Sequence, residues 1–187
     1  MSETSHAAGI ELTLDGKPVI ALPGETLWQL AKRHGERIPH LCLKDAPGYR
    51  PDGNCRACMV EIEGERTLAA SCLREAAPGM VVKSATSSRA RAARAGVVEL
   101  LLADQPARDD SPDRSSHFWR TAEQLQFDAA ATRAALPPRA PDPRALDDSH
   151  PAMRVNLDAC IHCGLCVRAC REVQVNDVIG LAGRGPH

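Results

Sequence analysis

The first hundred residues change between strand-like and helix-like patterns of apolar and polar positions. Apolar and polar residues alternate over 9–14, a strand-like run follows over 18–22, and Asp15-Gly16 between them is typical of a tight turn. This pattern predicts a β-hairpin. Apolar residues at helical spacing then begin at Leu27 and end before Gly35, which predicts a short helix.

A second hairpin is expected further along the chain. Residues 58–62 alternate, Gly64 supplies a turn, and 67–71 run back. Residues 80–83 add one more strand. We therefore expect an α+β fold in which a small mixed sheet carries one helix across it.

The pattern becomes helical over 87–104. Four apolar residues are spaced there to cover one stripe of the helix: Ala93, Val97, Leu100 and Leu101. Residues 105–151 are rich in proline and charge, which predicts a linker, with a helix from about Phe118 to Ala135 inside it.

These patterns predict three segments. Residues 1–104 form a domain with a trailing helix, 105–151 form a proline-rich linker with a short helix, and 152–187 begin a further domain.

Composition and charge narrow the function. The chain has 187 residues, 23 basic against 24 acidic side chains and a net charge of -1, so it has no field that would attract nucleic acid. No apolar run approaches the roughly 20 residues of a membrane span, and the start does not read as a secretory signal. We expect a cytoplasmic protein, in which eight cysteines act as metal ligands or redox groups rather than as disulfides.

The first four cysteines follow the spacing C-x12-C-x2-C-x13-C: Cys42, Cys55, Cys58 and Cys72. Four thiolates hold either a structural zinc ion or a [2Fe-2S] cluster. Zinc sites usually combine two close cysteine pairs, whereas only Cys55 and Cys58 are close here, so the spacing favours the cluster. Gly48, Gly53 and Asn54 are placed for a tight loop whose N–H groups point at cluster sulfurs. His40 is expected to be a loop residue with a local hydrogen bond.

The sequence around these cysteines resembles a known family. The matching runs are Ile38-Pro39-His40-Leu41-Cys42 and Pro51-Asp52-Gly53-Asn54-Cys55-Arg56-Ala57-Cys58-Met59-Val60-Glu61-Ile62-Glu63-Gly64. They resemble the N-terminal ferredoxin-like domain of NAD-linked redox enzymes: NADH dehydrogenase large iron–sulfur subunits, diaphorase subunits of NAD-reducing hydrogenases, and alpha subunits of NAD-dependent formate dehydrogenases. The resemblance implies a β-grasp fold over 9–104 with the four cysteines as [2Fe-2S] ligands.

The stretch after this domain departs from the NADH dehydrogenase pattern. In those relatives the matching helix leads into a histidine and three cysteines that hold a [4Fe-4S] cluster. Gln105 stands where the histidine would be, and no cysteine occurs between Cys72 and Cys160. We therefore expect no cluster in 73–159, and the departure favours the formate dehydrogenase branch.

The last four cysteines form the run C-x2-C-x2-C-x3-C that bacterial ferredoxins use for [4Fe-4S] clusters: Cys160, Cys163, Cys166 and Cys170. Gly164 relieves the tightest point, and His162 is expected to be exposed or to act indirectly. In two-cluster ferredoxins the fourth cysteine serves the other cluster, whose own run lies downstream. No such run follows before His187, so we expect a partial domain at the front of a longer protein. The alternative is that all four cysteines bind one cluster.

The resemblance implies electron transfer. We expect the iron–sulfur part of a formate dehydrogenase-like alpha subunit, which relays electrons between a molybdenum or tungsten pterin site and a subunit that binds flavin and NAD. The residues themselves contain no catalytic site. Arg171, where the family usually has proline, also favours this branch. The alternatives are a hydrogenase diaphorase or NADH dehydrogenase subunit and, in a different class, a zinc-stapled interaction module.

Overall fold

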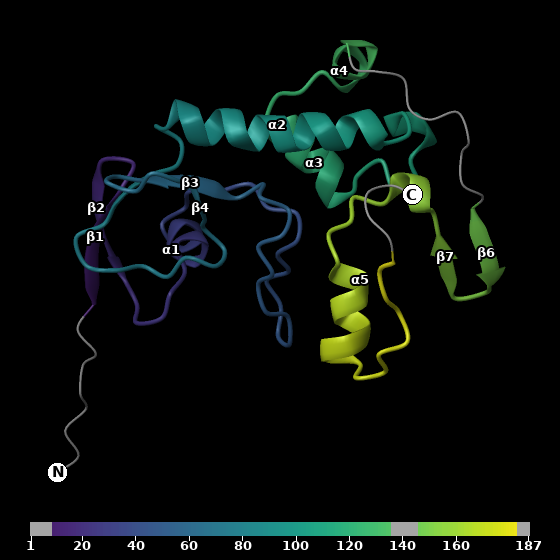
Figure 1. Cartoon of the computed structure of the whole chain (residues 1–187), viewed down its shortest axis with the longest axis horizontal. Helices are drawn as coiled ribbons and strands as arrows, with labels where there is room; N and C mark the ends of the chain where they lie inside the picture. The colour runs from purple at the N-terminus through teal and green to yellow at the C-terminus, as the bar shows by residue number, and fades with distance from the viewer. Residues whose placement is uncertain (1–8, 136–145, 183–187) are drawn as a thin grey trace. The chain divides into compact units, whose positions relative to one another are not determined.

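The structure, a computed structural model, describes residues 9–135 and 146–182 (Figure 1). It consists of two compact units. The first unit is built from Met1–Leu43 and Pro51–Arg94, and the second from Lys44–Arg50 and Ala95–His187.

The first unit contains a five-stranded sheet with the strand order β2-β1-β5-β3-β4. Its strands are β1 (Ile10–Leu14), β2 (Lys17–Ala21), β3 (Met59–Ile62), β4 (Ala69–Ala70) and β5 (Val81–Lys83). The strand β1 pairs antiparallel with β2 and parallel with β5, and β3 pairs antiparallel with β5 and β4. Both predicted hairpins and the predicted further strand are therefore confirmed.

Helix α1 (Leu27–Arg33) buries one face against this sheet (Figure 1). It begins at a capping box, in which Gln29 N–H donates to Thr26 Oγ1 at 3.3 Å and Thr26 N–H donates to Gln29 Oε1 at 3.0 Å. The Trp28 indole N–H donates to the Ile38 carbonyl at 3.2 Å, which satisfies its one polar atom in the core. A mixed sheet crossed by a single helix is the β-grasp arrangement that the sequence predicts.

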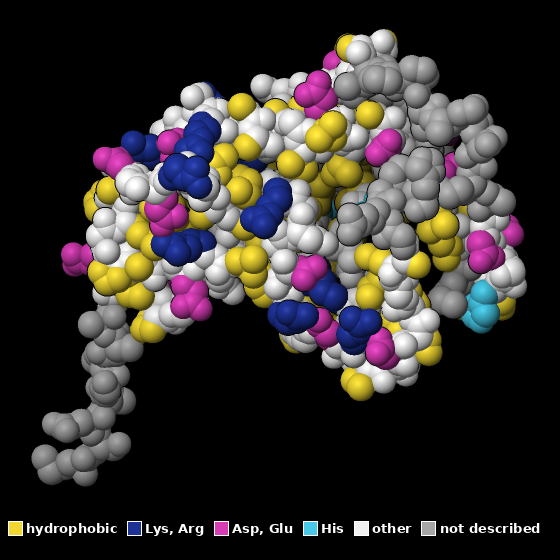
Figure 2. All heavy atoms as spheres, in the orientation of Figure 1, with side chains coloured by type: hydrophobic (Ala, Val, Ile, Leu, Met, Phe, Trp, Pro, Cys, Tyr) yellow, Lys and Arg dark blue, Asp and Glu magenta, His cyan; other side chains and the backbone are white. Residues whose placement is uncertain are grey.

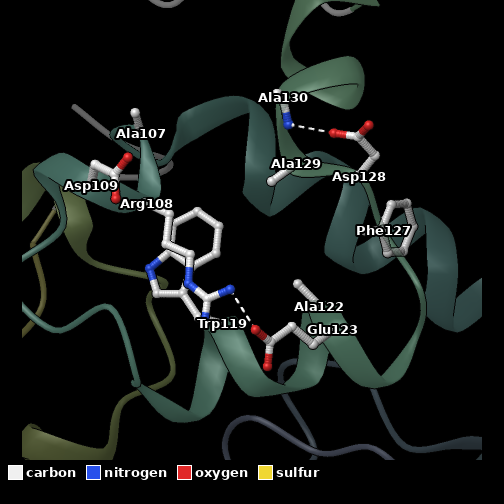
Figure 3. Close-up of a pocket in the computed structure, with 10 residues that line it drawn as sticks. All are labelled: Ala107, Arg108, Asp109, Trp119, Ala122, Glu123, Phe127, Asp128, Ala129 and Ala130. Atoms are coloured by element: carbon white, nitrogen blue, oxygen red, sulfur yellow. Dashed lines mark hydrogen bonds and ion pairs between the residues drawn. The ribbon is translucent and has the colours of Figure 1, made fainter.

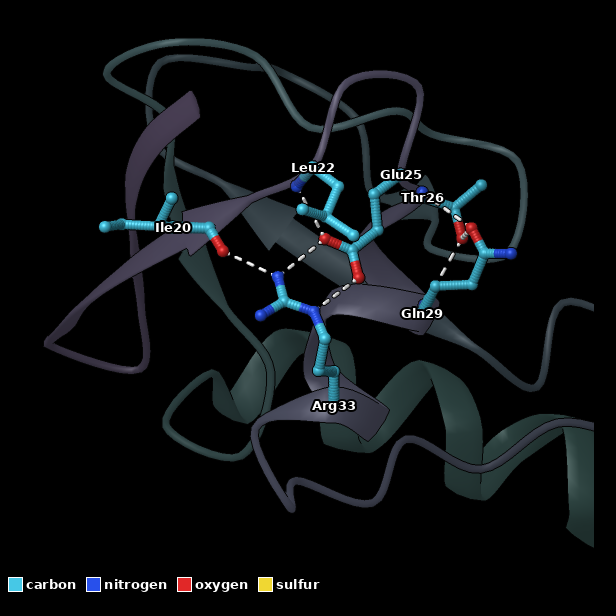
Figure 4. Close-up of polar contacts among 6 residues, drawn as sticks. All are labelled: Ile20, Leu22, Glu25, Thr26, Gln29 and Arg33. Carbon is cyan, nitrogen blue, oxygen red and sulfur yellow. Dashed lines mark hydrogen bonds and ion pairs between the residues drawn. The ribbon is translucent and has the colours of Figure 1, made fainter. Parts of the chain in front are cut away.

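An ion pair joins the two ends of α1 to the first hairpin (Figure 4). Arg33 Nε and Nη2 lie 2.9 and 2.8 Å from the two carboxylate oxygens of Glu25, and Nη2 also donates to the Ile20 carbonyl at 2.6 Å. The Leu22 N–H donates to the same carboxylate at 2.9 Å. The hydrogen bond from Arg33 is the main cause that lowers the pKa of Glu25.

Asp15, in the turn between β1 and β2, binds the chain that leaves β5. Its carboxylate accepts from the backbone N–H groups of Ser84, Ala85 and Thr86 at 2.7, 3.0 and 3.0 Å, and from Thr86 Oγ1 at 2.7 Å. Burial alone would raise the pKa of Asp15, but these hydrogen bonds outweigh burial and hold the pKa below its ordinary value.

The long predicted helix is present as α2 (Ser88–Asp104), and its fully buried residues are not those of the apolar stripe, of which Ala93, Val97 and Leu101 are half-buried. Leu100 is 69% exposed, and the buried positions follow a different row: Ala90, Arg94, Val98 and Leu102. The predicted stripe contains only apolar residues, whereas the buried row includes Arg94, whose guanidinium bonds to Met59 and Ser84.

The second unit holds the other short elements: η1 (Arg108–Asp110), α3 (His117–Gln124), α4 (Ala129–Ala135), β6 (Asp147–His150), β7 (Met153–Val155), η2 (Leu157–Ala159), α5 (Leu165–Arg168) and η3 (Ala169–Val173). The single helix predicted over 118–135 is wrong, since the chain breaks at Gln126, which has a φ of +60°. The β6–β7 hairpin was not predicted, because all four residues of β6 are exposed and carry no apolar alternation.

In the part of the chain that the structure describes, no helix is long and apolar enough to cross a membrane. Basic and acidic side chains are interspersed on the face drawn in Figure 2.

Candidate iron–sulfur sites

The first four cysteines come from the loops around β3 and β4 in the first unit. Cys42 and Cys55 belong to the irregular segment between α1 and β3, Cys58 directly precedes β3, and Cys72 follows β4. Cys42, Cys58 and Cys72 are buried, and Cys55 is half-buried.

These thiols form two contacting pairs, the first of which is Cys42 and Cys55. The Cys42 N–H lies 3.4 Å from Cys55 Sγ, and the Asn54 N–H also points at the Cys42 sulfur. The hydrogen bond between the two side chains lowers the pKa of Cys55 to about 6 and raises the pKa of Cys42. The lowered pKa of Cys55 favours the thiolate, which is the form that binds metal.

Cys58 and Cys72 form the second pair. The hydrogen bond between their side chains lowers the pKa of Cys58 to about 6 and raises the pKa of Cys72. Ser71 supports the pair, because its hydroxyl donates to the Cys58 carbonyl at 2.7 Å.

The donor set fits a [2Fe-2S] cluster. Cys72 interacts electrostatically with both members of the first pair, so the two pairs face a common region. Such a cluster needs two thiolates on each of its irons and N–H groups directed at sulfur. The two thiol pairs supply the first, and the backbone N–H groups of Cys42 and Asn54 supply the second. Across residues 9–135 and 146–182, no three His, Cys, Asp or Glu side chains form a group suited to a single metal ion.

The loop that carries Cys55 depends on Gly53. Its φ is +67°, and a Cβ atom there would lie 2.2 Å from Leu73 Cδ1. The Asn54 N–H is directed at the Cys42 sulfur, whereas Gly48, with a φ of +84°, belongs to the second unit. His40 lies where expected, with Nδ1 3.5 Å from the Ile38 carbonyl oxygen and its ring edge-on to Trp28.

The second cysteine run spans a loop, α5 and η3 of the second unit. Gly164, with a φ of +72°, precedes α5. His162 is exposed, and its N–H donates to Cys160 Sγ at 3.4 Å. Cys166 is exposed, whereas Cys170 is buried and accepts from the Val178 N–H at 3.3 Å. Cys170, the fourth cysteine of the run, is therefore more buried than the other three.

Two polar residues attach this run to the rest of the second unit. Gln105 is 2% exposed, and its Nε2 lies 3.5 Å from the Cys160 carbonyl oxygen. Buried Arg168 donates to the Arg50 carbonyl at 2.5 Å, and Arg50 pairs with Glu172 at 2.9 Å. The buried position of Gln105 could not be recognised from the sequence, which showed only an amide in place of a histidine.

A cavity of about 390 Å³ lies beside α3 in the second unit (Figure 3). Its ten lining residues include no Ser, Cys, His or Lys. Arg108 lies over the Trp119 ring and pairs with Glu123, and Asp128 accepts from the Ala130 N–H. The drawn charges are therefore engaged in structural contacts, and the cavity offers no nucleophile–base pair for catalysis.

Fold and thiols together define a ferredoxin-like iron–sulfur protein, and comparison with protein families agrees. Residues 7–87 match the 2Fe-2S iron-sulfur cluster binding domain, and residues 153–172 match the 4Fe-4S binding domain. The chain therefore combines a [2Fe-2S] domain with a 4Fe-4S motif.

Among iron–sulfur proteins, the chain is similar to subunits of NADH oxidoreductases. The chain is 31% identical over 186 residues to the mitochondrial NADH-ubiquinone oxidoreductase 78 kDa subunit of Candida albicans, covering 98% of this chain and 25% of that subunit. It is 30% identical over 180 residues to the NADH-quinone oxidoreductase G subunit of Rickettsia typhi, covering 95% of this chain and 26% of the relative. The chain spans about a quarter of the length of these curated relatives.

A solved structure is similar over a larger share of its length. A chain of an NAD+-reducing [NiFe]-hydrogenase in the H2-reduced state superposes with a TM-score of 0.79 at 30% identity, covering 95% of this chain and 72% of that chain. The protein belongs to the iron–sulfur family that includes this hydrogenase chain and the N-terminal regions of the NADH oxidoreductase 78 kDa and G subunits.

Proposed function

We propose that the chain relays single electrons as the iron–sulfur part of an NAD-linked oxidoreductase. The observation that carries this proposal is the set of four thiols in two contacting pairs, held by the β-grasp unit. Cys42 and Cys55 would bind one iron of a [2Fe-2S] cluster, and Cys58 and Cys72 the other. When bound, the cluster supplies one-electron transfer.

The second cysteine run extends the relay. Cys160, Cys163 and Cys166 would bind a [4Fe-4S] cluster. Cys170 would be either the fourth ligand of that cluster or a ligand of a second, neighbouring [4Fe-4S] cluster. The buried setting of Cys170, apart from exposed Cys166, supports the second choice. We retain the domain division 1–104, 105–151 and 152–187 as part of this proposal.

The NAD-linked oxidoreductase we favour is a cytoplasmic formate dehydrogenase, in which this chain would form the N-terminal part of the alpha subunit. Electrons would pass between a molybdenum or tungsten pterin region and a subunit that binds flavin and NAD. Three features of the sequence support this choice: Gln105 in place of the ligand histidine, the absence of cysteine between Cys72 and Cys160, and Arg171 in place of the usual proline.

A second candidate is a subunit of an NADH dehydrogenase or of a hydrogenase diaphorase. The relatives at about 30% identity favour it, because their names refer to NADH oxidoreductases and an NAD+-reducing hydrogenase. The complex purified with the chain from its source cells separates the candidates: formate should drive viologen reduction only in a formate dehydrogenase and hydrogen only in a hydrogenase, whereas reduction by NADH with neither formate nor hydrogen activity marks an NADH dehydrogenase.

Metal analysis of the full chain tests the relay itself. Anaerobically purified protein should contain iron and acid-labile sulfide, and dithionite should produce the electron paramagnetic resonance signal of a reduced [2Fe-2S] cluster. Cys55→Ser should remove this signal, whereas the matched variant Cys166→Ser should retain it. A colourless protein with stoichiometric zinc would refute the proposal and support the zinc-stapled module.

A further inference from the structure

A buried arginine lies on the side of the first unit that carries Cys58. Arg94, in α2, is 4% exposed. Its Nε donates to the carbonyl of Met59, the residue after Cys58, at 2.7 Å, and its Nη2 donates to Ser84 Oγ at 2.8 Å. These bonds direct the guanidinium toward the start of β3, where Cys58 enters its thiol pair.

The charge of this guanidinium has no carboxylate beside it. Within residues 9–135 and 146–182, Arg94 makes no ion pair with Asp or Glu. Asp15 attracts it only at longer range and is engaged with 84–86. Burial lowers the pKa of Arg94, and the nearby Cys58 sulfur opposes this effect. An unpaired buried cation is costly, so this position calls for a negative partner other than a carboxylate.

We propose that Arg94 is the buried counter-charge of the [2Fe-2S] site and raises its reduction potential. This inference rests on the proposed function. A cluster with four thiolate ligands is an anion and becomes more negative when it accepts an electron. A fixed positive charge shielded from water therefore stabilises the reduced form more than the oxidised form. An arginine side chain is not deprotonated in proteins, so Arg94 supplies a permanent positive charge.

Neutral replacements test the proposal. Arg94→Gln keeps hydrogen-bond donors near Met59 and Ser84, and Arg94→Met keeps much of the volume, but both remove the charge. We expect each to lower the equilibrium constant for one-electron reduction at least tenfold, which is about 59 mV for a one-electron couple. Arg94→Lys should remain closer to the wild type.

The matched control is Arg91→Gln on the same helix. Arg91 is exposed and donates to the Ala85 carbonyl at 3.1 Å, so its removal changes the net charge equally, but water and salt screen its field. Its potential should stay at the wild-type value. The measurement is a dithionite titration of the full chain, followed by the electron paramagnetic resonance signal of the cluster.

The outcomes separate this inference from the proposed function. Absence of a [2Fe-2S] signal from wild-type protein overturns both. A full cluster with unchanged potential in Arg94→Gln and Arg94→Met overturns the inference alone. Loss of the cluster from both neutral variants with retention in Arg94→Lys supports the counter-charge, whereas loss from all three variants shows a purely structural role and overturns it.

Discussion

Replacing Gly53 with alanine tests how the Cys55 loop is held against the segment after Cys72. The glycine has a φ of +67°, and an added methyl would lie 2.2 Å from Leu73 Cδ1. Two separate costs follow, one from the backbone and one from the overlap. Gly64, in the turn between β3 and β4, isolates the first cost, because its φ is +85° and nothing lies within 4 Å of the position that a methyl would take there.

The magnitudes follow from these two environments. A left-handed conformation destabilises the folded state by about 1–2 kcal/mol when the residue is alanine. Alanine also reduces the conformational entropy of the unfolded chain, which offsets about 0.4–1 kcal/mol of that loss. Gly64→Ala should therefore lower the free energy of unfolding by about 1 kcal/mol. The overlap adds about 1–3 kcal/mol at Gly53, at the lower end because Leu73 is 48% exposed and its side chain can turn aside. We expect about 2 kcal/mol in total for Gly53→Ala.

The double variant Gly53→Ala/Leu73→Ala separates the two costs. It removes the overlap and leaves the backbone cost, so a coupling energy of about 1 kcal/mol should appear between the two sites. Anaerobic urea unfolding followed by circular dichroism gives the free energies, and visible absorption reports the cluster content. Equal costs for Gly53→Ala and Gly64→Ala, with no coupling to Leu73, would refute this reasoning.

Two further predictions concern the polar contacts of the first unit. Arg33→Met removes the two-pronged contact with Glu25 and should lower the free energy of unfolding by about 1 kcal/mol, which urea titration measures; a loss that disappears when Glu25 is also replaced by Gln would assign it to this pair. Asp15→Asn should cost about 2 kcal/mol at pH 7, since a charged acceptor of the N–H groups of Ser84 and Thr86 is lost. Because the pKa of Asp15 is lowered in the folded state, the wild-type advantage is complete above the ordinary value of 3.8 and declines as the pH falls through the lower folded value. A gap between the urea midpoints of the two chains that is as large at pH 3 as at pH 7 would contradict this account.

The sequence predicted those parts of the fold that have strong local signals. The hairpin turn at Asp15-Gly16 and the alternation after Cys58 are enough to predict β1–β2 and β3. The burial of Arg94 in α2 could not be predicted from hydrophobicity, because its guanidinium bonds to Met59 and Ser84, which lie outside the helix.

The candidate site was predicted as a set of residues but not as an arrangement. Spacing alone does not say which thiols contact each other, and the pairs found here join Cys42 to Cys55 and Cys58 to Cys72. Cys55 and Cys58 are close in sequence but lie in different pairs, so closeness in sequence does not decide which thiols contact each other. The loop backbone decides the partners instead.

The position of β5 bears on how the protein is made. Among the described strands of the first unit, the two hairpins share no ladder with each other, and β5, the last strand of the sheet, pairs with both β1 and β3. During synthesis each hairpin can form as it leaves the ribosome, but the sheet cannot close until Val81 and Val82 have emerged. The four thiols of Cys42, Cys55, Cys58 and Cys72 precede this strand, so the nascent chain carries them before their scaffold is complete. We therefore expect cluster delivery to follow translation of β5, and a ribosome paused before Val81 to present thiols open to oxidation.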